Sequence, residues 1–128
     1  MIDQARPAAN MLLDQAQSEA CPVREVLDRI GDKWSVLVIT CLSEGAHRFN
    51  ALRRRIDGIS QRMLTETLRQ LERDGLVRRT LYPDAPVRVE YELTALGQTL
   101  IEPIAVLAAW AQRHRSEIAA AREVYDRR

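Results

Sequence analysis

The chain has 128 residues, of which 46% are hydrophobic and 29% charged, and its formal net charge is +1. This length suits one domain with a real core and is too short for two, and the composition is globular rather than disordered. No run approaches the ~18 apolar residues that a membrane-spanning helix needs, and residues 1–20 lack a signal-peptide core. We therefore expect a cytoplasmic protein that does not contact a membrane.

The near-neutral total hides one basic segment. Arginine supplies 18 of the 19 basic residues, and nine arginines lie within residues 45–79, where four acidic residues oppose them and leave a net charge of +5. The planar guanidinium group suits both phosphate groups and guanine edges. A general bias of composition toward arginine is the simpler explanation of that usage.

The first third of the chain predicts three helices. Residues 2–20 are rich in alanine, glutamine and leucine and predict the first, and Pro22 fits the first position of the second. The apolar positions of this second helix recur at helical spacing: Val23, Val26, Leu27 and Ile30. Asp32 is placed to cap the third helix, which Gly45 ends. Its expected apolar stripe is Trp34, Leu37, Val38, Cys41 and Leu42.

The basic segment contains a pair of helices. A short helix is expected from Arg48 to Ile56, followed by the turn signal Asp57-Gly58. Ser60 is a favoured N-cap for the next helix, which Asp74-Gly75 ends. Leucines at helical spacing turn this second helix toward the core: Leu64, Leu68 and Leu71. Two helices joined by a short turn that contains a glycine are typical of a helix-turn-helix.

After this pair the pattern changes to that of a β-hairpin. Residues 76–82 are rich in β-formers, residues 83–86 predict a loop, and residues 87–93 alternate between apolar and charged side chains. A hairpin directly after the second helix is a wing. The predicted fold class is therefore mainly α with a small β-hairpin, a winged helix-turn-helix.

The chain ends in a predicted long helix. Thr94 is placed to cap it, it runs to about Tyr125, and Pro103 is expected to bend it. Its apolar positions exceed what a terminal helix needs for docking on its own domain: Leu96, Leu100, Ile104, Leu107 and Trp110.

Taken together, the motifs closely resemble those of the HxlR-type regulators, which are bacterial and archaeal winged-helix proteins related to the MarR group. The matching segments follow one another at the family's spacing over residues 21–115: Cys21-Pro22-Val23, Asp32-Lys33-Trp34, Arg48-Phe49-Asn50-Ala51-Leu52, Ile59-Ser60-Gln61-Arg62-Met63-Leu64, Leu71-Glu72-Arg73-Asp74-Gly75-Leu76-Val77, Val89-Glu90-Tyr91-Glu92-Leu93-Thr94 and Gly97. Asp32 stands where the family commonly has glycine, a change that affects only a helix entry.

The resemblance implies a homodimer built from the N- and C-terminal helices, with two winged heads that read a palindromic site in double-stranded DNA. It divides the chain into a helical arm at 1–20, an HxlR-type winged domain at 21–115 and a C-terminal dimerisation helix at 94–128. The implied protein is a transcription regulator and not an enzyme.

The helix after Ser60 carries the expected base readers, because residues near the N-terminus of a recognition helix lie deepest in the major groove. We expect Gln61, Arg62 and Thr65 to contact bases and Arg69 to contact bases or backbone. Ser60 and the helix N-terminus suit a phosphate. The alternative is that Arg62 and Arg69 only solvate an exposed face.

Other arginines are expected at the DNA backbone. Arg48 begins the preceding helix and is placed to clamp a phosphate, and one or two of residues 53–55 should also reach the backbone. Arg88 resembles the wing arginine that winged-helix proteins insert into the minor groove. The alternative for Arg88 is an ion pair across the hairpin with Asp84 or Glu90. Arg78 and Arg79 are weaker candidates.

The input signal is less defined. Cys21 precedes Pro22 at a helix start, where the helix dipole lowers the pKa of a thiol, and some HxlR-type regulators sense quinones, aldehydes or oxidants through a cysteine at this position. Cys41 lies on an apolar stripe and is either an inert core residue or a disulfide partner of Cys21. A small-molecule effector bound near Trp34 or Trp110 is the rival input. Neither a metal site nor a cofactor motif is expected.

Two rival classes predict different features. A thiol peroxidase would need a resolving partner or general base near Cys21, and His47 and His114 are isolated. A winged-helix module that binds protein instead of DNA would present an apolar or acidic recognition face, whereas Gln61, Arg62, Thr65 and Arg69 are polar or basic.

Overall fold

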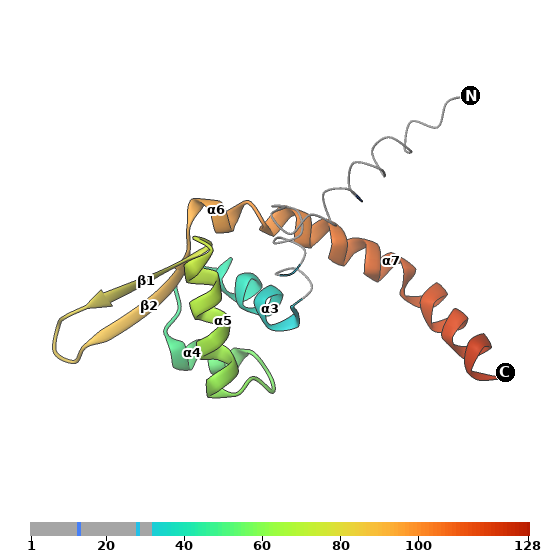
Figure 1. The fold of residues 1–128 in the computed structure, drawn as a ribbon, viewed down its shortest axis with the longest axis horizontal. Helices are drawn as coiled ribbons and strands as arrows, with labels where there is room; N and C mark the ends of the chain where they lie inside the picture. The colour runs from blue at the N-terminus through green and yellow to red at the C-terminus, as the bar shows by residue number, and fades with distance from the viewer. Residues whose placement is uncertain (1–12, 14–27, 29–31) are drawn as a thin grey trace, which may run out of the picture.

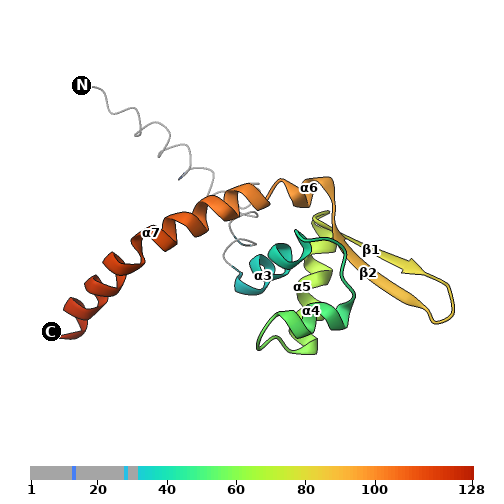
Figure 2. The same ribbon diagram turned by 180° about the vertical axis from the view of Figure 1, so that it is seen from behind.

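The computed structural model of the chain describes residues 13, 28 and 32–128, so the helices predicted for 2–20 and from Pro22 lie almost wholly outside the described residues. The elements are α3 (Lys33–Leu42), α4 (Phe49–Arg55), α5 (Gln61–Arg73), β1 (Val77–Tyr82), β2 (Arg88–Leu93), α6 (Ala95–Gln98) and α7 (Ile101–Asp126). Figure 1 shows α3, α4 and α5 gathered into a head, with the hairpin projecting from one side and α7 extending from the other. Figure 2 shows the same arrangement from behind.

The head is held together by an apolar core. Four leucines of the helix pair are almost fully buried: Leu52, Leu64, Leu68 and Leu71. Val38, Ile39 and Leu42 join them from α3, and Val77 and Leu93 join them from the hairpin. Each such leucine contributes about 1.5–3 kcal/mol when it leaves water, so the core fixes α5 against α3 and the base of the hairpin.

Both ends of α5 follow the predicted signals. The Ser60 hydroxyl accepts a hydrogen bond from the Met63 amide at 3.1 Å, as expected of an N-cap. At the other end, Gly75 has φ +77°, and the Leu76 amide donates to the Leu71 carbonyl at 2.9 Å. This is the Schellman arrangement, in which a left-handed glycine ends the helix and turns the chain directly into β1.

The hairpin is antiparallel, with Val77 opposite Leu93 at its base and Tyr82 opposite Arg88 at its tip. A feature that the sequence pattern did not predict ties it to the head. His47, just before α4, exchanges two backbone hydrogen bonds with Tyr91 of β2, at 2.9 and 2.8 Å. These bonds therefore tie the wing to the start of the helix pair.

The predicted long C-terminal helix is in fact two helices. Thr94 caps the short α6 through the Gly97 amide, residues 99–100 form a turn, and α7 begins at Ile101. In one continuous helix Pro103 would occupy the interior, at a cost of about 3 kcal/mol. The break places Pro103 in the first turn of α7, where a missing N–H has no partner to lose. The expected bend at Pro103 is therefore wrong, and a break precedes it.

The predicted stripe of α3 is also partly wrong. Leu37 is 38% exposed, whereas Ile39 is 2% exposed, and the fully buried positions are Ser35, Val38, Ile39 and Leu42. The sequence did not predict this buried face because one of its four residues, Ser35, is polar. Its hydroxyl is satisfied within the helix N-cap, where it donates to Asp32 at 3.2 Å.

Candidate nucleic-acid interface

The face of α5 opposite its buried leucines carries the polar side chains expected to read bases. Gln61, Arg62, Glu66 and Arg69 are exposed and Thr65 is half-buried, and these five line one shallow hollow of about 420 Å³. The structure therefore brings the four predicted α5 contacts together on one surface. The Thr65 hydroxyl donates to the Gln61 carbonyl at 2.8 Å, which leaves its methyl group and an oxygen lone pair for a base.

Arg62 lies at the second position of α5 and is 86% exposed. Its Nε donates to Glu66 Oε1 at 3.2 Å, one helical turn further along. Because this pair is solvent-exposed, it stabilises the helix by no more than about 0.5 kcal/mol. Both terminal amino groups of Arg62 make no hydrogen bond to any described residue, so the guanidinium presents its outer edge to solvent.

Arg88 begins β2 at the wing tip. Its guanidinium lies 4.5 Å from the centre of the Tyr82 ring on the opposite strand, and its Nε lies 3.8 Å from Glu90 Oε1 on the same strand. Arg88 Nε is buried without a hydrogen bond, and 38% of the side chain is exposed. The contact with Glu90 is the ion pair that was the alternative for Arg88, although it runs along one strand instead of across the hairpin. Together with the Tyr82 ring it holds Arg88 along the hairpin.

The three consecutive arginines of α4 have different surroundings. Arg55 forms a hydrogen-bonded ion pair with Glu44, which lowers the pKa of that carboxyl. Arg53 and Arg54 are exposed and line a hollow with Asn50. The ion pair occupies the Arg55 guanidinium, whereas Arg53 and Arg54 make no ion pair with a described residue.

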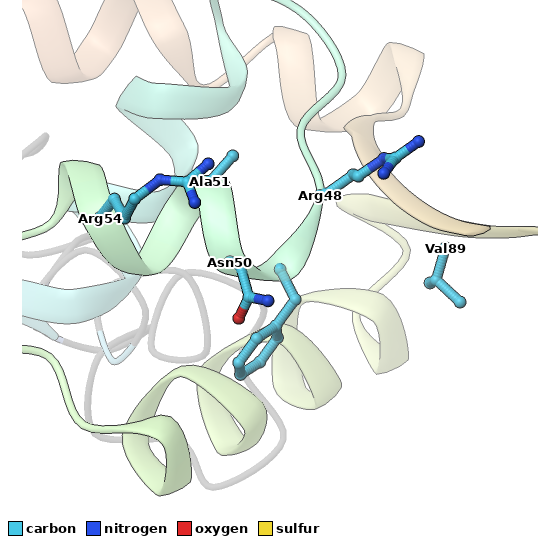
Figure 3. A pocket seen from close by; sticks show the side chains of 6 residues that line it. Arg48, Asn50, Ala51, Arg54 and Val89 are labelled. Carbon is cyan, nitrogen blue, oxygen red and sulfur yellow. The ribbon is translucent and has the colours of Figure 1, made fainter. Parts of the chain in front are cut away.

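A second hollow joins α4 to the wing, and Figure 3 shows its lining. It measures about 410 Å³ and is lined by Arg48, Phe49, Asn50, Ala51, Arg54 and Val89. Arg48 occupies the N-cap position of α4 without a side-chain cap. Two guanidinium groups and an amide therefore border a concave surface between the helix pair and β2, which suits a backbone phosphate.

Sequence reasoning underrated two residues of this surface. Asn50 lines both hollows on α4, and Arg79 shares a hollow of about 360 Å³ with Arg69 and Tyr91. The position of Arg79 could have been predicted from strand alternation. Val77 and Arg79 lie on the same face of β1, and Val77 packs in the core of the head. Within the described residues no ion pair involves Arg48, Arg53, Arg54, Arg69 or Arg79.

Of the two sensor candidates, Cys21 lies outside the described residues, as does any pairing with Cys41. Cys41 is half-buried against the core, and burial raises the pKa of its thiol above the usual range, against the opposing charge of Arg55. A raised pKa leaves little thiolate at neutral pH, and the thiolate is the reactive form. Cys41 therefore has the properties of a core residue.

We expect Cys41 in a Cys21→Ser variant to react with iodoacetamide at neutral pH at least several-fold more slowly than free cysteine. The rate should rise with pH beyond the point at which an ordinary thiol has already reached its maximum. Unfolding in urea should restore the free-thiol rate. Equal rates in the folded protein and in free cysteine would contradict this assignment.

The two tryptophans differ in their surroundings. Trp34 is half-buried against the core, and the Lys33 ammonium lies 4.4 Å from its ring centre. Trp110 is 48% exposed on α7, and its ring centre lies 4.8 Å from that of His114, with the two rings tilted by 42°. Among the residues described, no group of histidine, cysteine or acidic side chains could hold a metal ion, and no helix there is long and apolar enough to cross a membrane.

A capped second helix with a polar outer face, a short turn before it and a hairpin after it define a winged helix-turn-helix. Comparison with known proteins agrees. The family model for HxlR-like helix-turn-helix proteins matches residues 29–119. YtfH of Escherichia coli K12, named as an HTH-type transcriptional regulator, is 45% identical over 106 residues, which cover 83% of this chain and 84% of YtfH.

Solved structures give the same result. YtfH from Salmonella typhimurium matches with a TM-score of 0.72 and 42% identity, over 83% of this chain and 95% of that chain. The reduced form of the redox regulator HypR matches with a TM-score of 0.72 and 40% identity, over 77% of this chain and 98% of the HypR chain. The chain belongs to the HxlR-like helix-turn-helix family, and like its relatives it is a transcriptional regulator rather than an enzyme.

Proposed function

We propose that this regulator binds a palindromic operator in duplex DNA as a homodimer, with the N-terminus of α5 in the major groove and the wing tip at the adjacent minor groove. The observation that carries the proposal is the outer face of α5, where Gln61, Arg62, Thr65 and Arg69 share one exposed surface beside a hairpin that ends in Arg88.

The charges around α5 support the backbone contacts. Arg48 and Arg54 border the hollow between α4 and the wing, and Arg69 and Arg79 border the hollow between α5 and the wing. Phosphate contacts set the register and most of the affinity of a DNA complex, and base contacts set its sequence preference. Arginines on both sides of α5 fit that division, with Ser60 and the start of α5 placed for a further phosphate.

Dimerisation is supported by α7, in which no side chain is buried. Three large apolar side chains of α7 are exposed in the single chain: Val106 by 63%, Leu107 by 55% and Trp110 by 48%. A second subunit that packed against α7 would bury them. We assign 94–128 to the dimer interface together with the arm at 1–20, and 21–115 to the DNA-binding head. A regulator that reads DNA acts in the cytoplasm of a bacterium or archaeon.

For the input we propose oxidants or electrophiles, acting through Cys21. The support is the position of Cys21 before Pro22 and the name of the similar protein HypR, a redox regulator. Cys41 is the only other cysteine, and its half-buried position leaves Cys21 as the better reactive thiol. A small ligand near Trp34 or Trp110 is the alternative input.

The test is binding of the full chain to its own upstream intergenic DNA across a salt series, with and without diamide or a quinone. We expect binding that falls by about 10³–10⁵ between 50 and 200 mM salt, as is typical of six to ten phosphate contacts. Oxidant should release the DNA, and dithiothreitol should restore binding.

The variant Cys21→Ser distinguishes the response to oxidant from DNA binding by the head. This variant should bind reduced-state DNA normally and lose the oxidant response. Loss of all binding in Cys21→Ser would make the thiol structural, and binding that ignores oxidant in the wild type would favour a small ligand. Absence of DNA binding at any salt concentration would overturn the proposed function.

A further inference from the structure

Glu66 is the one acidic side chain among the five that line the hollow on the outer face of α5. Its side chain is 53% exposed, so burial does not explain its presence. A carboxylate on a surface that meets phosphates opposes binding through like-charge repulsion. If this surface reads DNA, another interaction of Glu66 in the complex must offset the repulsion between its carboxylate and the phosphates.

Helix stability explains only a small part of the pair that Glu66 forms with Arg62. At a spacing of four residues, the more stabilising order places the acid nearer the N-terminus, because the helix dipole favours negative charge there and positive charge at the C-terminus. Here Arg62 is the second residue of α5 and Glu66 follows it. The first turn of α5 contains no acidic residue at all.

The geometry of the pair matches a reading function instead. Glu66 Oε1 accepts from Arg62 Nε at 3.2 Å, which fixes the inner edge of the guanidinium and leaves both terminal amino groups available. Arginine reads guanine by donating two parallel hydrogen bonds to its O6 and N7 atoms. Because the Nε atom of Arg62 is already bonded to Glu66 before DNA binds, the arginine loses less side-chain entropy when it forms the bonds to guanine.

We propose that Glu66 is a specificity-determining residue, which orients Arg62 toward a guanine and weakens binding to any DNA that does not offer that guanine. In the operator complex the bonds to guanine retain Arg62 beside Glu66. On other sequences Arg62 turns to a phosphate, and Glu66 is left unpaired close to the DNA. This inference rests on the proposed function, because it requires α5 to read the major groove.

The experiment uses full-length protein and a random duplex library to select the preferred site, followed by titration of that site and of random DNA. Glu66→Gln should increase affinity for random DNA roughly three- to tenfold, because there the unpaired Glu66 carboxylate repels the phosphates. It should change affinity for the selected site by less than about threefold, because in that complex Arg62 stays beside Glu66 and offsets its charge. The site selected by Glu66→Gln should have a weaker guanine preference at one position in each half-site.

Two further variants isolate the pair. In an Arg62→Ala background Glu66→Gln should no longer change the guanine preference, as expected when two residues act through one interaction. Glu44→Gln removes the acid of another exposed arginine pair, with Arg55 of α4, and should leave the ratio of affinities unchanged.

An unchanged ratio of affinities in Glu66→Gln would overturn the inference, as would loss of preference at a cytosine with the guanine retained, since that would make Glu66 a direct reader of cytosine. If the wild type selects a site and only these results fail, the proposed function stands. If the wild type neither selects a site nor binds DNA, the proposed function itself fails.

Discussion

Arg62→Ala is expected to remove most of the sequence preference of the regulator. A bidentate arginine–guanine contact contributes about 1–3 kcal/mol of discrimination, and a dimer makes the contact once in each half-site. Affinity for the operator should therefore fall by a factor of roughly 30 to 2 × 10⁴. Random DNA loses only one charge contact per head, so its affinity should fall much less.

Fluorescence anisotropy with the selected site and a scrambled duplex measures both affinities. Arg73→Ala removes an exposed arginine from the last turn of α5, outside the face that is proposed to read bases, and should leave the ratio of the two affinities unchanged. Circular dichroism should show native helicity in both variants, because Arg62 is 86% exposed and packs against no core residue. A fall of equal size on both duplexes would assign Arg62 to the backbone and not to a base.

Gly97→Ala is expected to destabilise the fold severely. A Cβ atom at this position would lie 2.1 Å from the Leu76 carbonyl oxygen and 3.2 Å from Leu93 Cδ2, so either α6 or the start of β1 must move. Overpacking of this kind costs typically about 1–3 kcal/mol, and contact with backbone gives less scope for relaxation than contact with a flexible side chain. The gain of about 1 kcal/mol in helix propensity on replacing glycine with alanine does not compensate.

Urea unfolding followed by tryptophan fluorescence gives the free energy of unfolding. Gln98→Ala, at the exposed neighbouring position of α6, is the matched control and should stay within about 0.5 kcal/mol of the wild type. If Gly97→Ala also stayed within that range, the close approach of α6 to Leu76 would not be a rigid feature of the molecule.

The helix pair and the wing could be predicted because their signals are local. The cap at Ser60, the leucine spacing of α5, the glycine at residue 75 and the alternation before Thr94 each act within one or two turns of chain. The break at residues 99–100 could not be predicted in this way. It depends on α6 packing against Leu76, which lies some 20 residues earlier in the sequence.

In the candidate site, too, the features set by local sequence could be predicted, and those set by distant contacts could not. Periodicity alone places Gln61, Arg62, Thr65 and Arg69 on one face of α5. Which arginines remain available depends on partners distant in sequence, such as Glu44 for Arg55 at a separation of 11 residues. The stacking of Arg88 on Tyr82 likewise follows from hairpin register, which the loop sequence did not fix.

The attachment of α7 has a consequence for how such regulators diverge. Among the described contacts of α7 with the core of the head are those of Ile101 and Ile104 at its start, and this 26-residue helix is about 39 Å long. That reach is comparable to the 34–36 Å between half-sites one turn of DNA apart. In the proposed dimer α7 therefore sets half-site spacing and α5 sets the bases read. In that dimer, half-site spacing and base preference would depend on two different helices, so selection could alter one with little effect on the other.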